Sequence, residues 1–189
     1  AALRQFGFTN IARTTIPDDY ESTKTLIESS VKSHDVLILT GGISVGDYDF
    51  VGKAVHELEV KELFYKINQK PGKPIYMGKL NDAVIAGLPG NPAAALTCFY
   101  MYVLPVLNKL KGKGFVGLQK VALRMGENYQ KKGARAEFLK AKIIKDKLHV
   151  LGMQSSAMLR SFATADALVY IPEKTASVNE DDIVTAYLL

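Results

Sequence analysis

The sequence predicts two consecutive units, an α/β layered domain followed by a small all-β domain. In the first part of the chain, segments typical of strands alternate with segments typical of helices, which is the pattern of a sheet covered by helices. After the sequence KGKG at residues 111–114, strand-like runs separated by turn residues follow one another, with a single helical turn expected at residues 155–162. We therefore expect a domain boundary near residue 112, which divides the chain into residues 1–112 and residues 113–189.

The first unit begins with residues typical of the end of a helix, which Gly7 terminates because glycine suits the left-handed conformation there. A short strand is expected at residues 10–16, and Pro17 with the two acidic residues after it then favours the start of a helix. Residues 35–40 are rich in branched and apolar side chains, which is typical of a strand buried on both faces of a parallel sheet. The other elements expected in this unit are helices at residues 17–33, 49–58 and 92–110 and strands at residues 63–67, 74–77 and 83–87.

The second unit consists of short runs rich in β-branched, aromatic and apolar residues, with turn residues between them. This pattern predicts a small β sandwich or barrel. Its strands are expected at residues 119–124, 136–144, 148–151, 167–171 and 183–188.

The composition is that of an ordinary globular protein. Of 189 residues, 48% are hydrophobic and 23% are charged, which argues against a disordered chain or a collagen-like repeat. The single cysteine, Cys98, cannot form an internal disulfide, and its apolar surroundings predict a buried thiol in a reducing compartment. The longest apolar stretch, residues 93–107, is interrupted by Thr97 and Pro105 and is shorter than the roughly 20 residues of a membrane span. No signal peptide is recognisable, so we expect a cytoplasmic protein.

The net charge of +5 hides an uneven distribution along the chain. Residues 1–62 contain 6 basic and 10 acidic side chains, residues 63–147 contain 16 and 4, and residues 148–189 contain 2 and 5. The middle segment therefore has a net charge of +12, which favours an anionic ligand. A solvated lysine-rich surface is equally consistent with the charge alone.

A glycine-rich loop lies where a strand is expected to give way to a helix. Residues 40–49 have the sequence TGGISVGDYD, whose glycines allow backbone N–H groups to face an anion at a helix N-terminus. Ligands of open α/β sheets bind at the carboxyl ends of strands, where this loop is expected, although its spacing is neither a dinucleotide nor a Walker A pattern. Asp47 and Asp49 are candidate Mg²⁺ ligands beside such a phosphate site, and a tight turn capped by Asp49 is the structural alternative.

A second loop of the same kind has the sequence GLPGNP at residues 87–92. Asn91 is suited to cap the helix that follows, and Pro92 is suited to its first position. If parallel strands precede the two loops, two helix N-termini that favour anions lie close together.

A turn rich in lysine, with the sequence KPGKP at residues 70–74, lies between the two loops in the sequence. Lys66, Lys70 and Lys73 supply cations that suit phosphate or another oxyanion, and the prolines stiffen the segment that holds them. A surface hairpin with solvated lysines is the structural alternative for this segment taken alone.

Taken together, residues 35–50, 70–74 and 87–92 resemble the motifs of the molybdopterin molybdenumtransferases, the MoeA and gephyrin E-domain family of molybdenum cofactor biosynthesis. The resemblance extends through the β domain and covers essentially the whole chain. Family members have further N-terminal domains and an opening strand with a Gly-Asp-Glu motif, so the resemblance implies that this chain is a C-terminal portion. It implies a three-layer MogA-like molybdopterin-binding domain, with a mostly parallel sheet truncated at its first strand, followed by a small barrel-like β domain.

The resemblance also implies an activity, namely Mg²⁺-dependent insertion of molybdate into adenylated molybdopterin with release of AMP. It implies small anionic substrates, a homodimer in the full-length protein, and neither nucleic acid nor membrane as a partner. Carried over motif by motif, it implies catalytic roles for Asp49, Lys70, Lys73, Arg135 and Ser156, metal binding by Asp47 and Asp49, and pterin or nucleotide binding by Gly41, Gly42, Ser44, Gly46, Lys66, Pro89, Gly90, Asn91 and Pro92.

Two positions of the β domain depart from the family pattern. The sequence RAEFLK at residues 135–140 has Lys140 where the family has a second arginine, which removes a bidentate clamp. The sequence QSS at residues 154–156 has Ser155 where glycine is usual, which opposes a close approach of the backbone to a ligand. Ser156 remains a candidate.

Three alternatives stay open at this point. The MogA-like molybdopterin adenylyltransferases share the α/β domain and the first glycine loop, but they lack the appended β domain. A nucleic-acid-binding module would use the basic segment, although its lysines and arginines are not interleaved with an aromatic platform for single strands. A non-catalytic piece that binds a scaffold is the third, which the gephyrin resemblance allows.

Overall fold

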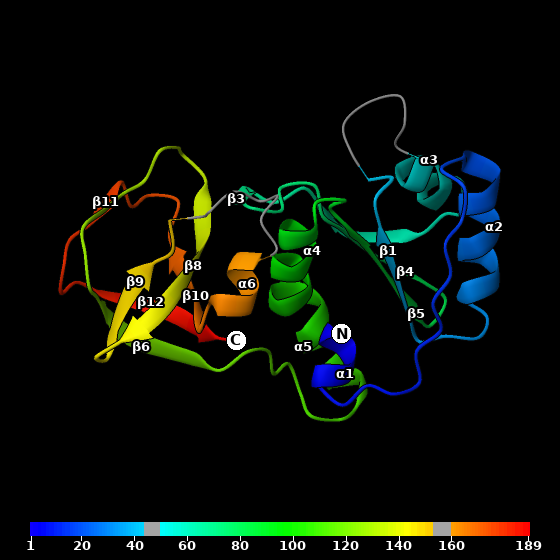
Figure 1. Cartoon of the computed structure of the whole chain (residues 1–189). Coiled ribbons are helices and arrows are strands. Elements are labelled where there is room, and N and C mark those ends of the chain that lie inside the picture. The colour runs from blue at the N-terminus through cyan, green and yellow to red at the C-terminus, as the bar shows by residue number, and fades with distance from the viewer. Residues whose placement is uncertain (44–49, 153–159) are drawn as a thin grey trace.

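Two sheets organise the computed structural model of this chain, which describes residues 1–43, 50–152 and 160–189 (Figure 1). Helices α2 and α3 pack on one face of the first sheet and helices α4 and α5 on the other, which gives the three layers expected of an α/β domain. The strands of this sheet are β1 (Val36–Thr40), β2 (Lys61–Tyr65), β4 (Tyr76–Leu80) and β5 (Ala83–Leu88), in the spatial order β1-β5-β4-β2. The helices are α1 (Ala2–Gln5), α2 (Tyr20–Ser30), α3 (Phe50–Glu57), α4 (Pro92–Cys98), the π-helical η1 (Phe99–Val103) and α5 (Leu104–Leu110).

The second sheet closes on itself. Its spatial order is β10-β12-β6-β9-β8-β3, and an additional pairing joins β10 to β8, so β10, β12, β6, β9 and β8 form a closed ring. This ring is a small barrel, one of the two architectures that the sequence predicts. The bounds are β3 (Gln69–Lys70), β6 (Lys120–Met125), β8 (Ala136–Ile144), β9 (Lys147–Val150), β10 (Ala167–Ile171) and β12 (Ile183–Leu188), with helix α6 (Arg160–Thr164) and a separate ribbon of β7 (Tyr129–Gln130) and β11 (Ser177–Val178).

The carboxyl ends of three strands, β1, β2 and β5, lie at one edge of the first sheet. β1 is parallel to β5, whereas β4 is antiparallel to both β5 and β2, so β2 runs in the same direction as β1 and β5. Three of the four strands thus run in the same direction, as expected, and β4 runs the opposite way. The physical reason is the two-residue turn at residues 81–82, which folds β5 directly back against β4.

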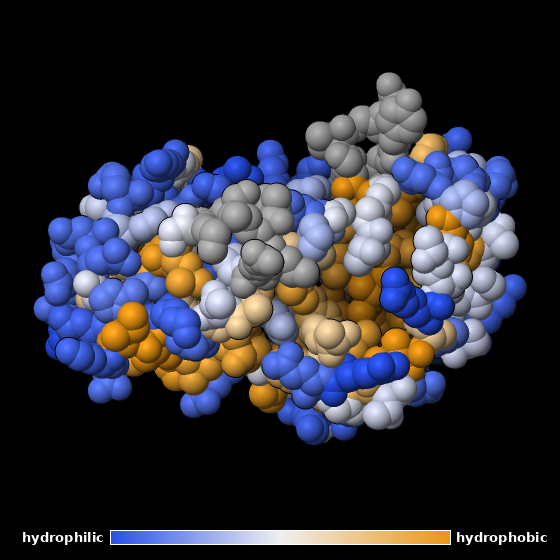
Figure 2. All heavy atoms as spheres, viewed as in Figure 1, coloured by the Kyte–Doolittle hydropathy of each residue, from blue (hydrophilic) through white to orange (hydrophobic). Residues whose placement is uncertain are grey.

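Residues 10–16 form no strand, so this prediction is wrong. A strand needs a partner for its backbone hydrogen bonds, and within the described residues β1 is paired with β5 alone. The side chains at residues 36–38 of β1 are correspondingly half-buried rather than buried on both faces. In the view of Figure 2, apolar side chains line a recess on the face of the first unit that is turned toward the viewer.

The helical rod from α4 through η1 to α5 is the core helix that the sequence predicts. By length and composition alone it could also cross a membrane. Its buried side chains, however, pack in the apolar cluster between the first sheet and the barrel, and they include Cys98, Phe99, Tyr100, Val103 and Leu104. Burial raises the pKa of the Cys98 thiol to about 12.

The barrel packs directly against this helix. Leu168 of β10 belongs to the same apolar cluster, and the Phe162 ring of α6 lies 6.2 Å from the Tyr100 ring between centroids. Strand β3 leaves the first unit and pairs in parallel with β8 of the barrel. The two units thus share part of a core and part of a sheet, and the boundary near residue 112 stays a prediction.

Candidate functional site

The described start of the first glycine-rich loop lies beside the second loop, at the carboxyl ends of β1 and β5. Thr40 and Leu88, the last residues of these parallel strands, are register partners. The Gly41 N–H lies 3.4 Å from the Leu88 carbonyl oxygen that accepts it, and a Cβ on Gly90 would come within 3.5 Å of the Gly41 Cα. The prediction that the two loops meet is confirmed, and it depends on the parallel pairing of β1 with β5.

The first loop begins with two residues in the left-handed conformation, Gly41 at φ 88° and Gly42 at φ 63°. Glycine adopts this conformation without the steric cost that a Cβ imposes. The Gly42 carbonyl then accepts the Val51 N–H at 3.3 Å, which ties the loop to the start of α3. The other predicted residues of this loop, Ser44, Gly46, Asp47 and Asp49, lie outside the described residues.

The second loop ends in a complete helix cap. The Asn91 side-chain oxygen accepts the Ala93 and Ala94 N–H groups at 3.2 and 3.3 Å, and Pro92 occupies the first turn of α4. Pro89 is buried and Gly90 is exposed, so the backbone at Gly90 is the accessible part of this loop. The capping role predicted for Asn91 is therefore confirmed, and an anion there would meet backbone groups that Asn91 already partly satisfies.

Lys66 directly follows β2 and lies at the same edge of the sheet as the two loops. Register partners connect the strands in one row from Tyr65 to Tyr76, from Tyr76 to Gly87 and from Gly87 to Leu39. With neighbouring strands about 4.8 Å apart, the edge from β2 to β1 is about 14 Å long. The Lys66 side chain is exposed, with its Nζ 4.4 Å from the centroid of the Tyr65 ring.

Lys70 and Lys73 follow Lys66 on a turn that extends from this edge of the sheet. We call residues 66–75 the lysine turn. Its base is closed by the Lys66 N–H donating to the Ile75 carbonyl at 2.9 Å and the Ile67 N–H donating to the Lys73 carbonyl at 3.0 Å. Gly72, at φ 93°, packs so closely that an added Cβ would clash with the Cys98 sulfur and lie 3.7 Å from the Ala94 carbonyl. The turn therefore lies against the first turns of α4, immediately after the second loop.

Lys70 is bound to the barrel rather than free in solvent. Its Nζ lies 3.2 Å from Oε1 of Glu137, a β8 residue whose side chain is only 3% exposed. The Tyr129 hydroxyl donates to the other carboxylate oxygen of Glu137 at 2.6 Å. Burial, and then this bond to Glu137, raise the pKa of Tyr129.

Arg135 lies at the same junction. Its Nη1 donates to the Gln69 carbonyl at 3.3 Å, so it binds the backbone of the lysine turn. The Gln69 side chain is buried, donates to the Pro71 carbonyl at 2.9 Å and accepts the Tyr102 hydroxyl. Lys73 of the same turn is exposed, and Ser156 lies outside the described residues.

The structure therefore brings most described site residues to one edge, with Arg135 at the junction with the barrel. Sequence reasoning missed Gln69, Tyr129 and Glu137 as members of this arrangement. The alternation along β8 carries a signal for one of them, because it puts the Glu137 carboxylate on the same face as Leu139 and Ala141, in the barrel core. An acidic residue on a core face requires a partner.

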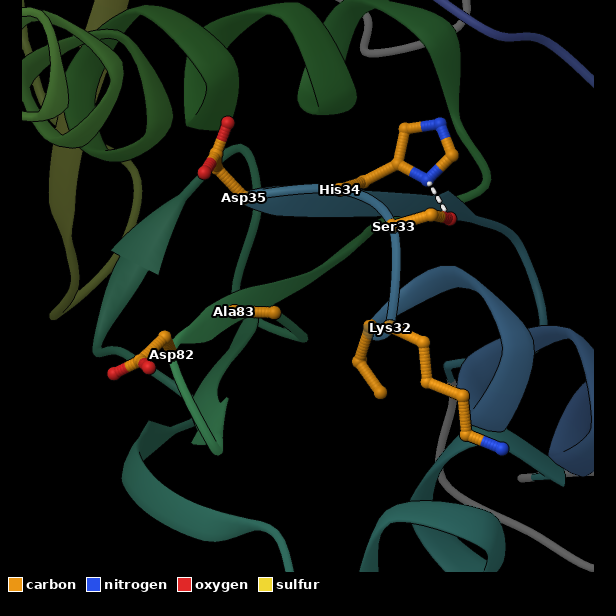
Figure 3. A pocket seen from close by; sticks show the side chains of 7 residues that line it. Lys32, Ser33, His34, Asp35, Asp82 and Ala83 are labelled. Carbon is orange, nitrogen blue, oxygen red and sulfur yellow. Dashed lines mark hydrogen bonds between the residues drawn. The ribbon is translucent and has the colours of Figure 1, made fainter.

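A shallow cavity of about 230 Å³ lies at the opposite edge of the first sheet (Figure 3). It is lined by residues that precede β1 and β5, among them His34, Asp35 and Asp82. Figure 3 shows that these side chains point in different directions, with one hydrogen bond between Ser33 Oγ and His34 Nδ1 at 2.9 Å. The cavity is separate from the motifs and contributes nothing to the site.

Comparisons with known proteins agree with the geometry. Residues 1–109 match the family described as a probable molybdopterin binding domain, and residues 122–189 match the MoeA C-terminal region, domain IV. The chain is 29% identical to a molybdopterin molybdenumtransferase of Staphylococcus epidermidis and 31% identical to one of Haemophilus influenzae. These alignments cover 100% and 90% of this chain, but only 46% and 43% of the relatives.

A solved structure titled molybdopterin biosynthesis MoeA protein, from Pyrococcus horikoshii, shares the fold. Its TM-score is 0.75 at 32% identity, and the match covers 90% of this chain and 41% of that one. A structure titled molybdenum cofactor biosynthesis protein, from Pyrococcus furiosus, matches 100% of this chain with a TM-score of 0.78 at 23% identity, which bears on the fold alone. The chain thus spans less than half the length of the curated relatives described above.

Proposed function

This chain belongs to the MoeA family of molybdopterin-binding proteins, and we propose that it forms the anion-binding part of an enzyme that inserts molybdate into adenylated molybdopterin. One observation carries the proposal, namely the meeting of both glycine-rich loops and the lysine turn at one edge of one sheet. A pterin phosphate, an adenylate and molybdate are all anions. Backbone N–H groups at strand-to-helix turns and lysine ammonium groups are suited to bind them.

Each described motif has a distinct part in this proposal. Gly41 and Gly42 allow a phosphate to approach the backbone at the end of β1, and Gly90 does the same at the end of β5. Asn91 fixes the second loop through its cap of α4. Lys66 and Lys73 are exposed along the lysine turn and attract the oxyanion.

A magnesium ion enters the proposal through Asp47 and Asp49, neither of which belongs to the described residues. Within residues 1–43, 50–152 and 160–189, no three His, Cys, Asp or Glu side chains are grouped so that they could hold a metal ion. The described residues by themselves therefore supply no such group, and the proposed metal ligands are Asp47 and Asp49.

The barrel favours the molybdenumtransferase over the adenylyltransferase alternative. The lysine turn is held from the barrel side by the pairing of β3 with β8, by the Glu137 carboxylate and by the Arg135 guanidinium. A protein that lacked the barrel would lose all three of these supports. We propose that the whole enzyme is a cytoplasmic homodimer; the chain itself spans less than half the length of these relatives.

The direct test is a calorimetric titration of the chain with adenylated molybdopterin, with and without Mg²⁺. The proposal expects saturable binding with a 1:1 stoichiometry. Heat no greater than dilution at millimolar ligand would contradict it for this chain. Saturable, sequence-specific binding of duplex DNA at physiological salt would support the nucleic-acid alternative instead.

A second test addresses Asp49 in the full-length protein. Because a carboxylate ligand is needed for the proposed divalent ion, Asp49→Asn is expected to reduce Mg²⁺-dependent AMP release in a single turnover. An unchanged rate of AMP release would remove Asp49 from the mechanism.

A further inference from the structure

The carboxylate of Glu137 is buried on the core side of β8, where the lysine turn meets the barrel. It is only 3% exposed, and its two oxygens have different partners, Lys70 on the lysine turn at 3.2 Å and the Tyr129 hydroxyl at 2.6 Å. A buried carboxylate is strongly destabilised unless a cation or hydrogen-bond donors compensate its charge. The only positive charge that forms an ion pair with it in the described chain comes from the other unit, through Lys70.

Lys70 is held by Glu137 while more than half of its side chain stays exposed. Its side chain is 55% exposed, and an ammonium group has three N–H donors, so the bond to Glu137 leaves others for a ligand. Its backbone is also held, because Lys70 and Glu137 are register partners in the pairing of β3 with β8. The neighbouring residue Gln69 is tied by its carbonyl to Arg135 and by its side chain to Tyr102.

We infer that Glu137 is a positioning residue, which holds the Lys70 ammonium group at the anion site and so makes the barrel part of that site. The inference rests on the proposed function, because an oxyanion is what the positioned ammonium group binds. A lysine side chain has many rotamers in solvent, and one that is already ordered loses less entropy when a ligand binds. Glu137 thus acts on the ligand through Lys70, without touching it.

The alternative is that this ion pair only fastens the barrel to the first unit. The two possibilities differ in what neutralising Glu137 does to Lys70 and to anion binding. If the pair is only a fastener, its loss changes the stability of the chain and does not weaken anion binding, because removing a carboxylate beside a cation by itself favours an anion. If it positions Lys70, its loss changes both the order of the Lys70 side chain and the anion affinity.

The test compares Glu137→Gln with a matched control, Glu173→Gln, in the full chain. Glutamine keeps the shape of the side chain and can still accept the Tyr129 hydroxyl, but it removes the charge that holds Lys70. Glu173 contacts the same segment from the barrel side, where its Oε1 accepts the Asn68 amide at 2.7 Å, but it does not contact Lys70. If Glu137→Gln fails to fold, Glu137→Asp retains the charge on a shorter side chain and is expected to displace Lys70 in the same way.

The first readout needs no ligand. In the NMR spectrum of protein labelled at the lysine Cε carbon, the Lys70 methylene signal is identified by its loss in Lys70→Arg. We expect two distinct Cε proton shifts in the wild type, and averaging of these shifts in Glu137→Gln but not in Glu173→Gln. Identical Lys70 signals in Glu137→Gln and the wild type would overturn the inference, whether or not the chain binds an anion.

The second readout is calorimetric titration with molybdate. We expect Glu137→Gln to weaken molybdate binding about threefold, a loss in the range measured for partly exposed ion pairs, and Glu173→Gln to leave it unchanged. In a Lys70→Gln background the same substitution should have no further effect, because it acts through Lys70. An equal loss in both backgrounds would overturn the inference, whereas absence of binding to the wild type would contradict the proposed function and leave the decision to the NMR readout.

Discussion

Substituting Gly72 by alanine should destabilise the chain and loosen the lysine turn. An added Cβ would clash with the Cys98 sulfur and lie 3.0 Å from the Gln69 amide nitrogen, and both neighbours are buried. Overpacking of this kind costs about 1–3 kcal/mol. The backbone at φ 93° adds a conformational cost of about 1–2 kcal/mol for any residue with a Cβ, so the sum is about 2–5 kcal/mol.

The two parts of this cost can be separated by urea unfolding of four proteins. These are the wild type, Gly72→Ala, Cys98→Ala and the double variant. Removing the Cys98 sulfur makes room for the new methyl group, so the double variant should be at least 1 kcal/mol more stable than the sum of the single effects predicts. Strictly additive effects would show that the close packing of Gly72 against Cys98 does not exist in solution, and would refute the placement of the turn on α4.

Three further predictions concern the framework of the site. Asn91→Ala removes the cap of α4 and should lower the free energy of unfolding by about 1 kcal/mol. Asn91→Asp keeps an acceptor for the same N–H groups and should leave the free energy of unfolding unchanged. Equal losses in the two variants would contradict the capping geometry. Because burial raises the pKa of Cys98 to about 12, the native thiol should resist iodoacetamide at pH 8 and react after unfolding, and rapid native labelling would contradict its burial. The hydrogen bond that Asp19 accepts from the Ser22 N–H lowers the pKa of Asp19. The stabilisation from this bond should therefore be present above the unfolded pKa of 3.8 and disappear as the pH falls through the lower folded pKa. NMR titration of the Asp19 carboxyl carbon measures the folded pKa, and a value at or above 3.8 would contradict the cap.

The parts of the site that the sequence predicts are those fixed by local chemistry. A glycine run after a strand, and Asn-Pro before an apolar helix, each define a strand-to-helix turn through their own backbone preferences. Their meeting required one further assumption, that β1 and β5 are parallel neighbours, and Thr40 and Leu88 are indeed register partners. These features depend on a few adjacent residues, so sequence patterns are sufficient to find them.

The parts that the sequence did not predict depend on partners far along the chain. Residues 10–16 have the composition of a strand, but a strand exists only where another strand accepts its hydrogen bonds, and none of the described strands does. Strand β3 has only two residues, and its partner β8 begins 66 residues later, at Ala136. The contact between Lys70 and Glu137 follows from that pairing, so no local pattern around either residue reveals it.

We propose that the edge of the first sheet at the carboxyl ends of β1, β2 and β5, together with the lysine turn that extends from it, binds the anionic substrate. The most direct measurement of this proposal is the affinity for molybdate of two charge-matched variants, Lys66→Gln at this edge and Lys79→Gln at the opposite end of β4. Lys79 pairs with Asp82, has a side chain 46% exposed and lies across from the amino end of β1, so it controls for the loss of one surface charge. A charge-assisted hydrogen bond contributes about 1.5–3 kcal/mol, so Lys66→Gln should weaken molybdate binding about tenfold or more, and Lys79→Gln less than twofold. Equal losses in the two variants would show that molybdate responds only to the net charge, and would contradict the account.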